Sequence, residues 1–208
     1  REQRDAFDKQ ELKRIFNLRK LKSESIDKNK PAYYWVPLLG LYTGARLNEL
    51  CQLYINDIKE IDKIWCIDIN RNTNDKKLKN ASSERVIPIH PKLIELRFLN
   101  YVKEQKKKNS QRLFSHLKLG SDGYIKNVSR FFNVRWLHEI GVKTNKKSFH
   151  SLRHTFTNEL KQAGVSEQVA SELLGHASQS ITYGRYGKES RIEILMKEIS
   201  KIQIKIIR

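Results

Sequence analysis

Apolar positions recur at helical spacing in two adjacent stretches of the C-terminal third of the chain. The first stretch predicts a helix from about Ser151 to Gln162, which Gly164 is placed to end. The second predicts a helix from Ser166 to Leu174, with Ser166 as its N-cap and Gly175 as its stop. The apolar stripe of this second helix consists of Val169, Ala170, Leu173 and Leu174.

Polar side chains cluster at the ends of these two helices. His150 and Arg153 are three residues apart, which places both on one helix face, about 5–6 Å apart at Cβ. His176 follows the second helix, and Tyr183 and Tyr186 follow in a turn. Since helix ends are sites where phosphates bind, the pattern predicts an oxyanion site beside a phenol.

Three helices are predicted in the N-terminal quarter of the chain. An amphipathic helix runs from Asp8 to about Leu21, and a buried helix from Ala32 to Leu41 needs a kink or a break at Pro37. After a turn at residues 43–46, a helix runs from Leu47 to Leu53. Arg46 and Glu49 are spaced like an ordinary structural ion pair, and that interpretation competes with a role in chemistry.

A β-rich stretch follows. Two short strands around a turn at Asp62-Lys63 are predicted by Ile58, Ile61, Ile64, Trp65, Ile67 and Ile69. Arg85–Ile89 predicts a third strand, with Pro88 favouring the sheet edge. The loop between the last two strands holds three lysines, namely Lys76, Lys77 and Lys79. They form either a solvated lysine run or a contact with a DNA groove.

The remaining apolar patterns are helical. They predict helices from Pro91 to Glu104 and from Val128 to Ile140, and the tail from Ser190 to Ile207 has apolar residues at helical spacing. The inward-facing residues expected in the second of these helices are Phe131, Phe132, Val134, Trp136 and Leu137. Those of the tail are Ile192, Leu195, Met196, Ile199, Ile202 and Ile206.

Composition narrows the class of partner. The 208 residues suffice for one large or two small domains, and a net charge of +18 favours nucleic acid first and an anionic membrane second. No apolar run reaches the length of a membrane span, and the charged N-terminus is unlike a signal peptide. Cys51 and Cys66 are expected to be buried, reduced thiols of a cytoplasmic protein. Because the chain begins at Arg1 and its only methionine is Met196, we expect it to be a fragment.

Several catalytic schemes fit the sequence poorly. His150 and His154 have the spacing of a zinc-binding pair, but Ser151 stands where a glutamate would be needed and no third ligand is evident. No serine is flanked by nucleophile-elbow glycines, and there is no phosphate-binding loop for a nucleoside triphosphate. Phosphodiester chemistry fits better, since arginines stabilise a phosphoryl transition state, a phenol can attack phosphorus and a lysine can protonate the leaving oxygen.

Four sequence motifs together resemble the tyrosine recombinases, the phage integrase family. They are the segment Thr43–Leu50 (TGARLNEL), the segment His150–Phe156 (HSLRHTF), the segment Leu173–His176 (LLGH) and Tyr186. The resemblance covers about residues 5 to 190 in the order of the family's motifs. It implies an α+β, mainly helical catalytic domain at residues 1–190, with a small antiparallel sheet carrying a basic hairpin loop, and a helical tail at 191–208 for assembly. The family's N-terminal core-binding domain is expected to be absent from this chain.

The resemblance also implies a mechanism. Arg46 and Arg153 would clamp the scissile phosphate, with Glu49 supporting them, and His150 would act as an acid or base. His176 would bind a non-bridging oxygen, Lys79 would protonate the 5′ oxygen, and Tyr186 would form a 3′-phosphotyrosyl link. The reaction would need no cofactor and no metal. The implied partners are double-stranded DNA, three further copies in a tetramer on paired sites, and accessory DNA-bending proteins, but no membrane.

Alternatives remain at three points. In many relatives the nucleophile lies nine residues after the last histidine, but Arg185 occupies that position here, so Tyr186 is preferred over Tyr183. Lys77 is the second choice for the hairpin lysine. A type IB topoisomerase or an inactive DNA-binding relic would share parts of the pattern. The preferred function is site-specific recombination for integration or excision of a phage or another mobile element.

Overall fold

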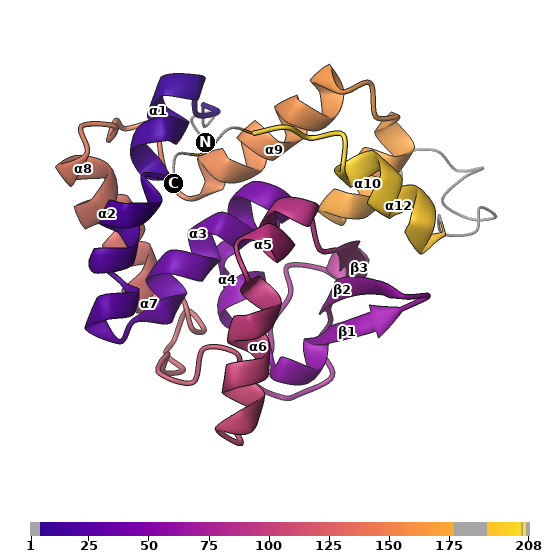
Figure 1. Ribbon diagram of the computed structural model, residues 1–208, viewed down its shortest axis with the longest axis horizontal. Coiled ribbons are helices and arrows are strands. Elements are labelled where there is room, and N and C mark those ends of the chain that lie inside the picture. Colours follow the sequence, from indigo (N-terminus) through magenta and orange to yellow (C-terminus); the bar gives the residue numbers. More distant parts are fainter. Residues whose placement is uncertain (1–4, 177–190, 205, 207–208) are drawn as a thin grey trace.

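The computed structural model describes residues 5–176, 191–204 and 206, and helices dominate it (Figure 1). The helices before the sheet are α1 (Lys9–Ile15), α2 (Leu18–Ser23), η1 (Ile26–Lys28), α3 (Pro31–Thr43), α4 (Leu47–Cys51) and η2 (Ile55–Asp57). The sheet region contains β1 (Ile58–Ile61), β2 (Ile64–Ile69), η3 (Ala81–Ser83) and β3 (Arg85–Pro88). The later helices are α5 (Pro91–Glu95), α6 (Phe98–Lys107), α7 (Lys126–Ser129), η4 (Arg130–Trp136), α8 (Leu137–Glu139), α9 (His150–Gln162), α10 (Glu167–Leu174) and α12 (Ile192–Ile199).

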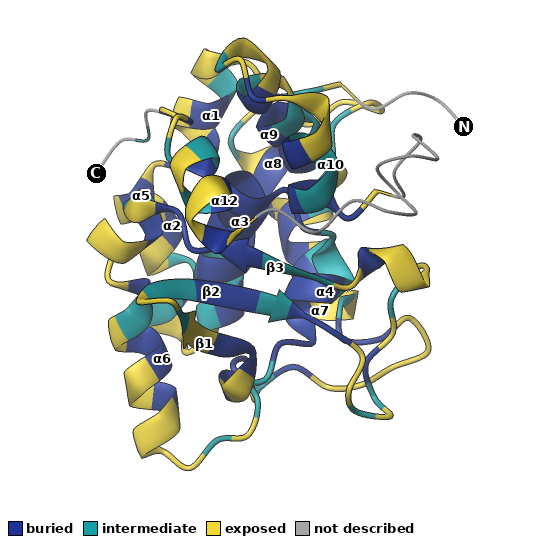
Figure 2. Ribbon diagram, turned by 90° about the vertical axis from the view of Figure 1, so that its right-hand side faces the viewer, coloured by how far each residue is buried: buried dark blue, intermediate teal, exposed yellow. Residues whose placement is uncertain are grey.

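Helix α3 forms the centre of the core. Its residues from Trp35 to Thr43 are all buried, and it packs most extensively on α9 (Figure 2). The predicted buried helix is therefore confirmed, and it continues through Pro37 without a break. Pro31 begins the helix, where a missing N–H costs nothing, and Gly44 ends it with a left-handed backbone at φ 63°.

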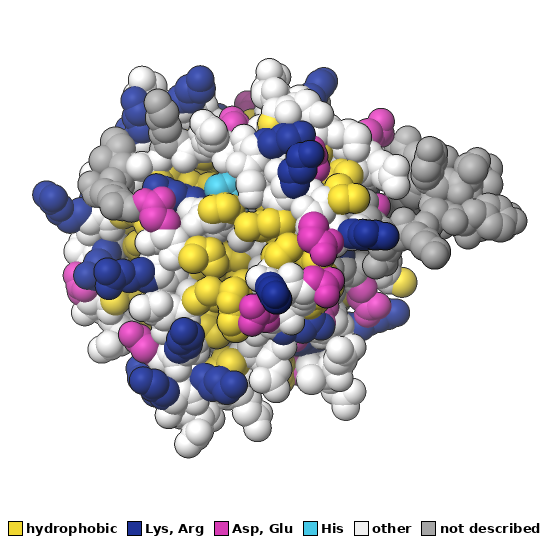
Figure 3. Space-filling view, turned by 45° about the vertical axis from the view of Figure 1, so that its right-hand side comes forward, with side chains coloured by type: hydrophobic (Ala, Val, Ile, Leu, Met, Phe, Trp, Pro, Cys, Tyr) yellow, Lys and Arg dark blue, Asp and Glu magenta, His cyan; other side chains and the backbone are white. Residues whose placement is uncertain are grey.

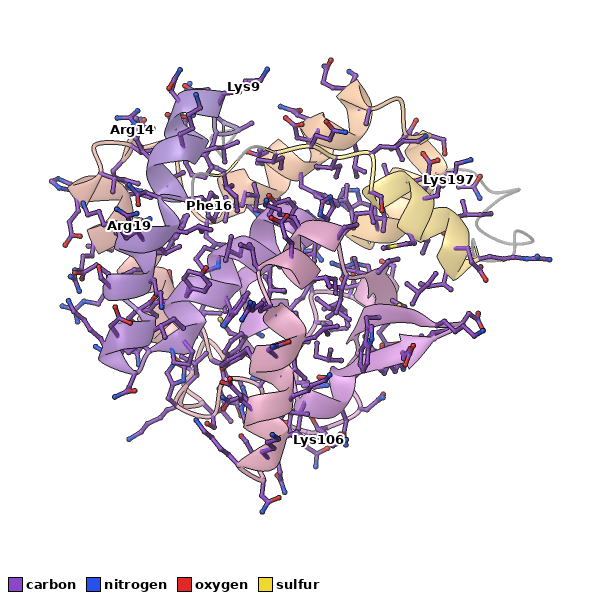
Figure 4. All side chains as sticks on the ribbon, viewed as in Figure 1. Lys9, Arg14, Phe16, Arg19, Lys106 and Lys197 are labelled. Carbon is purple, nitrogen blue, oxygen red and sulfur yellow. The ribbon has the colours of Figure 1, made fainter. Side chains whose placement is uncertain are left out.

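The predicted helix from Asp8 to Leu21 is wrong as a single element. The chain forms α1 and α2 instead, because Asn17 leaves the helix and its side chain accepts a hydrogen bond from the Lys20 backbone at 3.2 Å, which starts α2. Phe16 at the break is fully buried and points into the helical body, whereas Arg14 and Arg19 project outward (Figure 4). The break thus turns one aromatic side chain into the core.

Two other helix predictions needed correction. The segment from Pro91 to Glu104 divides into α5 and α6 at Arg97, whose backbone is left-handed at φ 67°. The segment from Val128 to Ile140 is continuous, but its central turn is a π-helix, η4. Val134, predicted to face inward, is 66% exposed because it falls on the side of the helix opposite the buried Phe132 and Trp136.

The sheet is three-stranded and antiparallel in the order β1-β2-β3. The turn between β1 and β2 is formed by Asp62 and Lys63, both with positive φ, as the tight hairpin turn requires. Pro88 lies on the outer strand β3 opposite Cys66, so the expected edge position is confirmed. Helices α10 and α12 pack against β3, which joins the sheet to the helical body (Figure 2).

The surface carries both apolar and basic groups. On the face drawn in Figure 3, apolar side chains gather at the centre, and Lys and Arg side chains lie around them. Cys51 and Cys66 are buried free thiols, as expected, and burial raises the pKa of Cys66 to about 11. None of the helices in the described ranges is long and apolar enough to cross a membrane.

Candidate functional site

The first element of the site is the turn that joins α3 to α4. A Cβ atom on Gly44 would lie 2.5 Å from Cδ1 of Phe156 and 2.9 Å from Cδ2 of Leu174, so α9 and α10 both close on this turn. Arg46 is the N-cap residue of α4 and follows the turn directly. The tight packing of the glycine therefore fixes where Arg46 leaves the core.

Glu49 holds Arg46 in place. One carboxylate oxygen accepts from Nη1 of Arg46 at 2.7 Å, and the other accepts from the Arg46 backbone at 2.9 Å. Burial alone would raise the pKa of Glu49, but the guanidinium of Arg85 and hydrogen bonds from Arg85 and Arg46 outweigh it and hold the pKa below its usual value. Glu49 is thus a buried, charged anchor, and the structural ion pair is present whether or not Arg46 also acts in chemistry.

Arg153 projects from α9 into the same region. Its Nη1 donates to the Gly44 carbonyl at 2.8 Å, and its Nη2 donates to the Leu174 carbonyl at 2.8 Å. Burial, together with repulsion from Arg46 and Arg85, lowers the pKa of Arg153 to about 10. The guanidinium therefore bridges the α3–α4 turn and the end of α10 while remaining charged at neutral pH.

His176 lies next to Arg153. Gly175 ends α10 with a left-handed backbone, and Nε2 of His176 is then 2.7 Å from Nη2 of Arg153. Partial burial lowers the pKa of His176, and repulsion from nearby cations, which include Arg153 and Lys79, lowers it further. Arg46, Arg153 and His176 are therefore brought together as predicted from three separate motifs.

His150 occupies a different position on α9. It is the first residue of the helix and is exposed, and its ring packs edge-on against His154 with the centroids 5.0 Å apart. Partial burial and then the charge of Arg153 lower the pKa of His154. His150 lies three residues before Arg153 on the same helix, where it is exposed, whereas Arg153 is buried.

The basic hairpin loop is held through the backbone of Lys77, while two of its lysine side chains are exposed. Asn48 donates to the Lys77 carbonyl at 3.3 Å, and Gln52 accepts from the Lys77 backbone at 2.9 Å, whereas the side chains of Lys77 and Lys79 are exposed. Lys76 was expected to be solvated or to contact DNA, and this is wrong. It is buried and bonded to both carboxylate oxygens of Asp57 at 2.7 and 2.8 Å.

A network around Asp75 was not predicted from the sequence. Its carboxylate accepts from the hydroxyls of Tyr54 at 2.9 Å and Tyr124 at 2.6 Å, and from Arg112 at 3.1 Å. Burial would raise the pKa of Asp75, but hydrogen bonds from Tyr124, Thr73 and Tyr54 lower it to about 2. The network ties the hairpin loop to three distant parts of the chain.

Arg85 was also missed, because the sequence indicated only that it begins a strand. Its Nη2 donates at 2.9 Å to Glu49, the carboxylate that also accepts from Arg46. No local signal distinguishes this arginine from the many others in a basic chain. The only hint available was a charged residue at the start of an apolar strand.

The predicted nucleophile is the one role whose residue has no described position. Tyr186 and its alternative Tyr183 lie outside the described residues. Within residues 5–176, 191–204 and 206, no three His, Cys, Asp or Glu side chains lie close enough together to hold a metal ion.

Solved structures of similar fold extend over most or all of the chain. The integrase from mycobacterium phage Brujita matches with a TM-score of 0.64 and 17% identity, covering 100% of this chain and 60% of that one. XerH site-specific recombinase bound to difH substrate matches with a TM-score of 0.53 and 20% identity, covering 96% of this chain and 55% of that one. At these identities the likeness establishes the fold, which is the mainly helical α+β fold expected from the sequence.

Sequence comparison establishes the family. A tyrosine recombinase of Pseudothermotoga lettingae is 30% identical over 156 residues, covering 74% of this chain and 49% of that protein. Tyrosine recombinase XerA of Pyrococcus furiosus is 30% identical over 172 residues, covering 76% of this chain and 51% of that protein. The chain thus spans about half the length of these curated relatives. Since residues 6–191 match the sequence model of the phage integrase family, the chain belongs to the phage integrase family of tyrosine recombinases.

Proposed function

We propose that this chain is the catalytic part of a site-specific DNA recombinase that cleaves and rejoins strands through a 3′-phosphotyrosyl intermediate. The observation that carries the proposal is the meeting of Arg46, Arg153 and His176 at the junction of α4, α9 and α10. These residues present fixed donors within one small region, as stabilisation of a pentavalent phosphoryl transition state requires.

The proposed reaction begins when the Tyr186 oxygen attacks the scissile phosphorus. The new bond joins the phenol oxygen to phosphorus, and the bond from phosphorus to the 5′ oxygen breaks. The phenol proton passes to His150 or to water, and the 5′ oxygen takes a proton from Lys79. Rejoining reverses these steps with the 5′ hydroxyl of another strand, so the bond energy is conserved.

Arg46 and Arg153 are proposed to bind the non-bridging oxygens. Arg46 is 23% exposed in its side chain, so it can reach a ligand while Glu49 holds its other edge. Arg153 is 6% exposed and already donates to two carbonyls. Its main proposed contribution is therefore the electrostatic attraction of its positive charge for the phosphate, rather than a new hydrogen bond. His176 completes the set once an anion replaces Arg153 as its partner.

Lys79 is the preferred general acid. Its side chain is exposed two residues after Lys77, whose backbone is held by Asn48 and Gln52, so it can reach an oxygen bound beside the loop. Lys77 is the second choice, because both its N–H and its carbonyl are bonded to those two side chains.

Double-stranded DNA is the proposed partner. The net charge of +18 provides many phosphate contacts, and binding should weaken steeply as salt is raised. XerH and the Tn1549 transposon integrase were both solved with DNA. A tetramer on paired sites, accessory DNA-bending proteins and a cytoplasmic setting complete the proposal. No cofactor is assigned.

Residues 1–190 are proposed to form the catalytic domain and residues 191–208 an assembly tail. Helix α12 packs against its own chain, on β2, β3 and α10, with Ile192, Leu195 and Ile199 buried. This packing favours a stabilising role for the tail within its own chain. The assembly role is therefore proposed for the outer side of α12, where Ile194 is 46% exposed.

The test is covalent capture of DNA. Nicked substrates prepared from the DNA that flanks the gene should give a protein–DNA adduct on a denaturing gel, with EDTA present. Tyr186→Phe should bind DNA normally but give no adduct, whereas Tyr183→Phe should keep measurable cleavage. Peptide mapping that places the nucleotide on Tyr183, or wild-type protein that never forms an adduct, would refute the proposal. Relaxation of supercoiled plasmid that lacks paired sites would favour the topoisomerase alternative.

A further inference from the structure

Arg85 uses all sides of its guanidinium inside the protein. Its Nε donates to the Leu173 carbonyl at 2.8 Å, its Nη1 to the Ser83 carbonyl at 2.7 Å, and its Nη2 to Glu49 at 2.9 Å. The side chain is only 6% exposed. Arg85 is therefore not available to bind a DNA phosphate itself.

Its three partners belong to the three segments that carry the proposed site. Glu49 is the anchor of Arg46. Leu173 precedes Leu174, whose carbonyl accepts from Arg153, and the chain then reaches His176. Arg85 thus connects α4 with the end of α10.

The third partner leads to the hairpin loop. The Ser83 hydroxyl accepts from Nη1 of Arg46 at 3.2 Å and donates to the side chain of Asn80, the residue after Lys79. Arg85 binds the backbone of this same serine. The contacts of this one buried guanidinium therefore extend to the Arg46 side of the site, to the end of α10 and to the hairpin loop.

We propose that Arg85 is a positioning residue that sets Arg46, His176 and the base of the Lys79 loop in one arrangement for the phosphate. This inference rests on the proposed function. It holds that a residue that never touches the substrate fixes the geometry of the residues that do. Arginine suits the task because its planar fork donates in three fixed directions, whereas lysine has one compact ammonium group.

Charge supports the same role. Glu49 forms ion pairs with Arg46 and Arg85, and its charge is also felt by Arg153. Three guanidiniums with one carboxylate leave the cluster with a net positive charge. Without Arg85, the carboxylate would be left to neutralise Arg46 alone. The fit is also close, since a Cβ on Gly175 would lie 2.8 Å from Nη1 of Arg85.

The first test compares Arg85→Lys with Arg71→Lys. The first variant keeps the buried charge and loses the fork, and the second makes the same change at a largely exposed arginine paired with Glu84. On the nicked substrate, Arg85→Lys should form adduct on the order of a hundredfold more slowly, because small displacements of catalytic groups have effects of this size. Affinity for an arbitrary short duplex at low salt should stay within about twofold, since one buried cation adds no phosphate contact. Arg71→Lys should match the wild type in both measurements.

A second measurement does not depend on the DNA reaction. Inorganic phosphate is titrated into each protein, and the Nε–Hε NMR signals of Arg46 and Arg153 and the ring signals of His176 are followed. In the wild type these signals should shift at the same phosphate concentrations. In Arg85→Lys the apparent phosphate affinity should fall about tenfold, and the Arg46 and His176 signals should shift at different concentrations. If wild-type protein forms no adduct, the proposed function fails, while this titration still decides the role of Arg85.

A second variant tests the role of Arg85 if Arg85→Lys does not fold. If Arg85→Lys lacks dispersed NMR signals, Gly175→Ala takes its place, because the new Cβ displaces Arg85 and every charged group remains. Gly164→Ala is its control, since Gly164 has a similar φ of +71° with nothing within 4 Å of the added atom. Wild-type adduct rates and wild-type phosphate response in a folded Arg85→Lys, or in Gly175→Ala if that is used, would overturn the inference.

Discussion

The Nη2 atom of Arg153 and the Nε2 atom of His176 lie 2.7 Å apart, and the arginine can only donate. His176 therefore accepts on Nε2, is neutral and carries its proton on Nδ1. An anion bound at the site would draw Arg153 toward itself and favour a proton on Nε2. We therefore expect binding of phosphate and uptake of a proton by His176 to be coupled.

The pKa of His176 should be lower than that of an ordinary histidine and should rise when phosphate binds. Because the folded pKa is depressed, the unfolded state binds more protons between the two pKa values. The contribution of His176 to stability is present above the unfolded pKa near 6.5 and is lost as the pH falls through the folded pKa. NMR titration measures the pKa, and urea unfolding across this pH range measures the stability.

The control for this prediction is His138→Gln, a change at an exposed position, beside His176→Gln. The glutamine at 176 can still accept from Arg153 but does not titrate. The difference in unfolding free energy between the wild type and His176→Gln should therefore change with pH. Parallel pH curves for all three proteins would contradict the neutral assignment.

Lys79→Ala should slow adduct formation by about a hundredfold to ten-thousandfold, the usual range for loss of a general acid. Lys77→Ala should slow it by much less, because the backbone that fixes the loop through Asn48 and Gln52 is retained. Both variants remove one exposed positive charge, so their DNA affinities should fall equally. A larger loss of cleavage in Lys77→Ala would exchange the two assignments.

Gly44→Ala should destabilise the fold more than Gly164→Ala. Both glycines have left-handed backbones, at φ +63° and +71°, so each substitution introduces strain of about 1–2 kcal/mol. Only at Gly44 does the new atom meet packed side chains, Phe156 at 2.5 Å and Leu174 at 2.9 Å, which adds about 1–3 kcal/mol of overpacking. Urea unfolding of the two variants tests this, and equal losses would show that the turn adapts.

Sequence patterns predicted the site helices better than the N-terminal ones. Ser166 and Gly175 are strong local signals, and α10 begins and ends beside them. The break between α1 and α2 depends on Asn17 capping a new helix while Phe16 turns into the core, and the apolar spacing continues through it. The spacing of apolar residues does not predict a helix break of this kind, because the break depends on which side chains are buried in the folded protein.

The motif residues of the site and the contact of Glu49 with Arg46 were predicted, but the contacts of Arg85 and Lys76 were not. Arg46, Arg153 and His176 lie in recognisable motifs and meet as expected. Arg85 acts through Leu173, which is 88 residues away, and Lys76 is buried against Asp57, 19 residues away. A polar, lysine-rich segment looks solvated from its composition, and only the fold reveals which of its charges are paired.

Asp75→Asn should loosen the hairpin loop. The carboxylate accepts charge-assisted bonds, and loss of such bonds typically costs about 2 kcal/mol at neutral pH. Because the folded pKa is about 2 and the unfolded value is about 3.9, the contribution is present above the unfolded pKa and disappears as the pH falls toward 2. The stabilities of the wild type and the variant should therefore converge in acid.

Unfolding at several pH values and hydrogen exchange of residues 70–77 measure the two consequences of the Asp75 change. Asp122→Asn is the matched control, since Asp122 is exposed. Faster exchange in the loop of Asp75→Asn but not of Asp122→Asn is expected. A constant stability gap between wild type and Asp75→Asn down to pH values near 2 would show that the carboxylate is not the source of the effect.

The two sides of α12 should separate stability from assembly. Ile199 is fully buried, so Ile199→Ala should cost about 2–4 kcal/mol, and truncation after Glu189 should remove enough buried surface to unfold the chain. Ile194 is 46% exposed, so Ile194→Lys should leave the unfolding free energy within about 0.5 kcal/mol of the wild type. That variant should still bind a single DNA site. It should form fewer higher-order complexes on paired sites, because burying a lysine at a contact between two proteins is costly. Sedimentation of the DNA complexes measures assembly, and unchanged complexes in Ile194→Lys would assign the tail to the stability of its own chain alone.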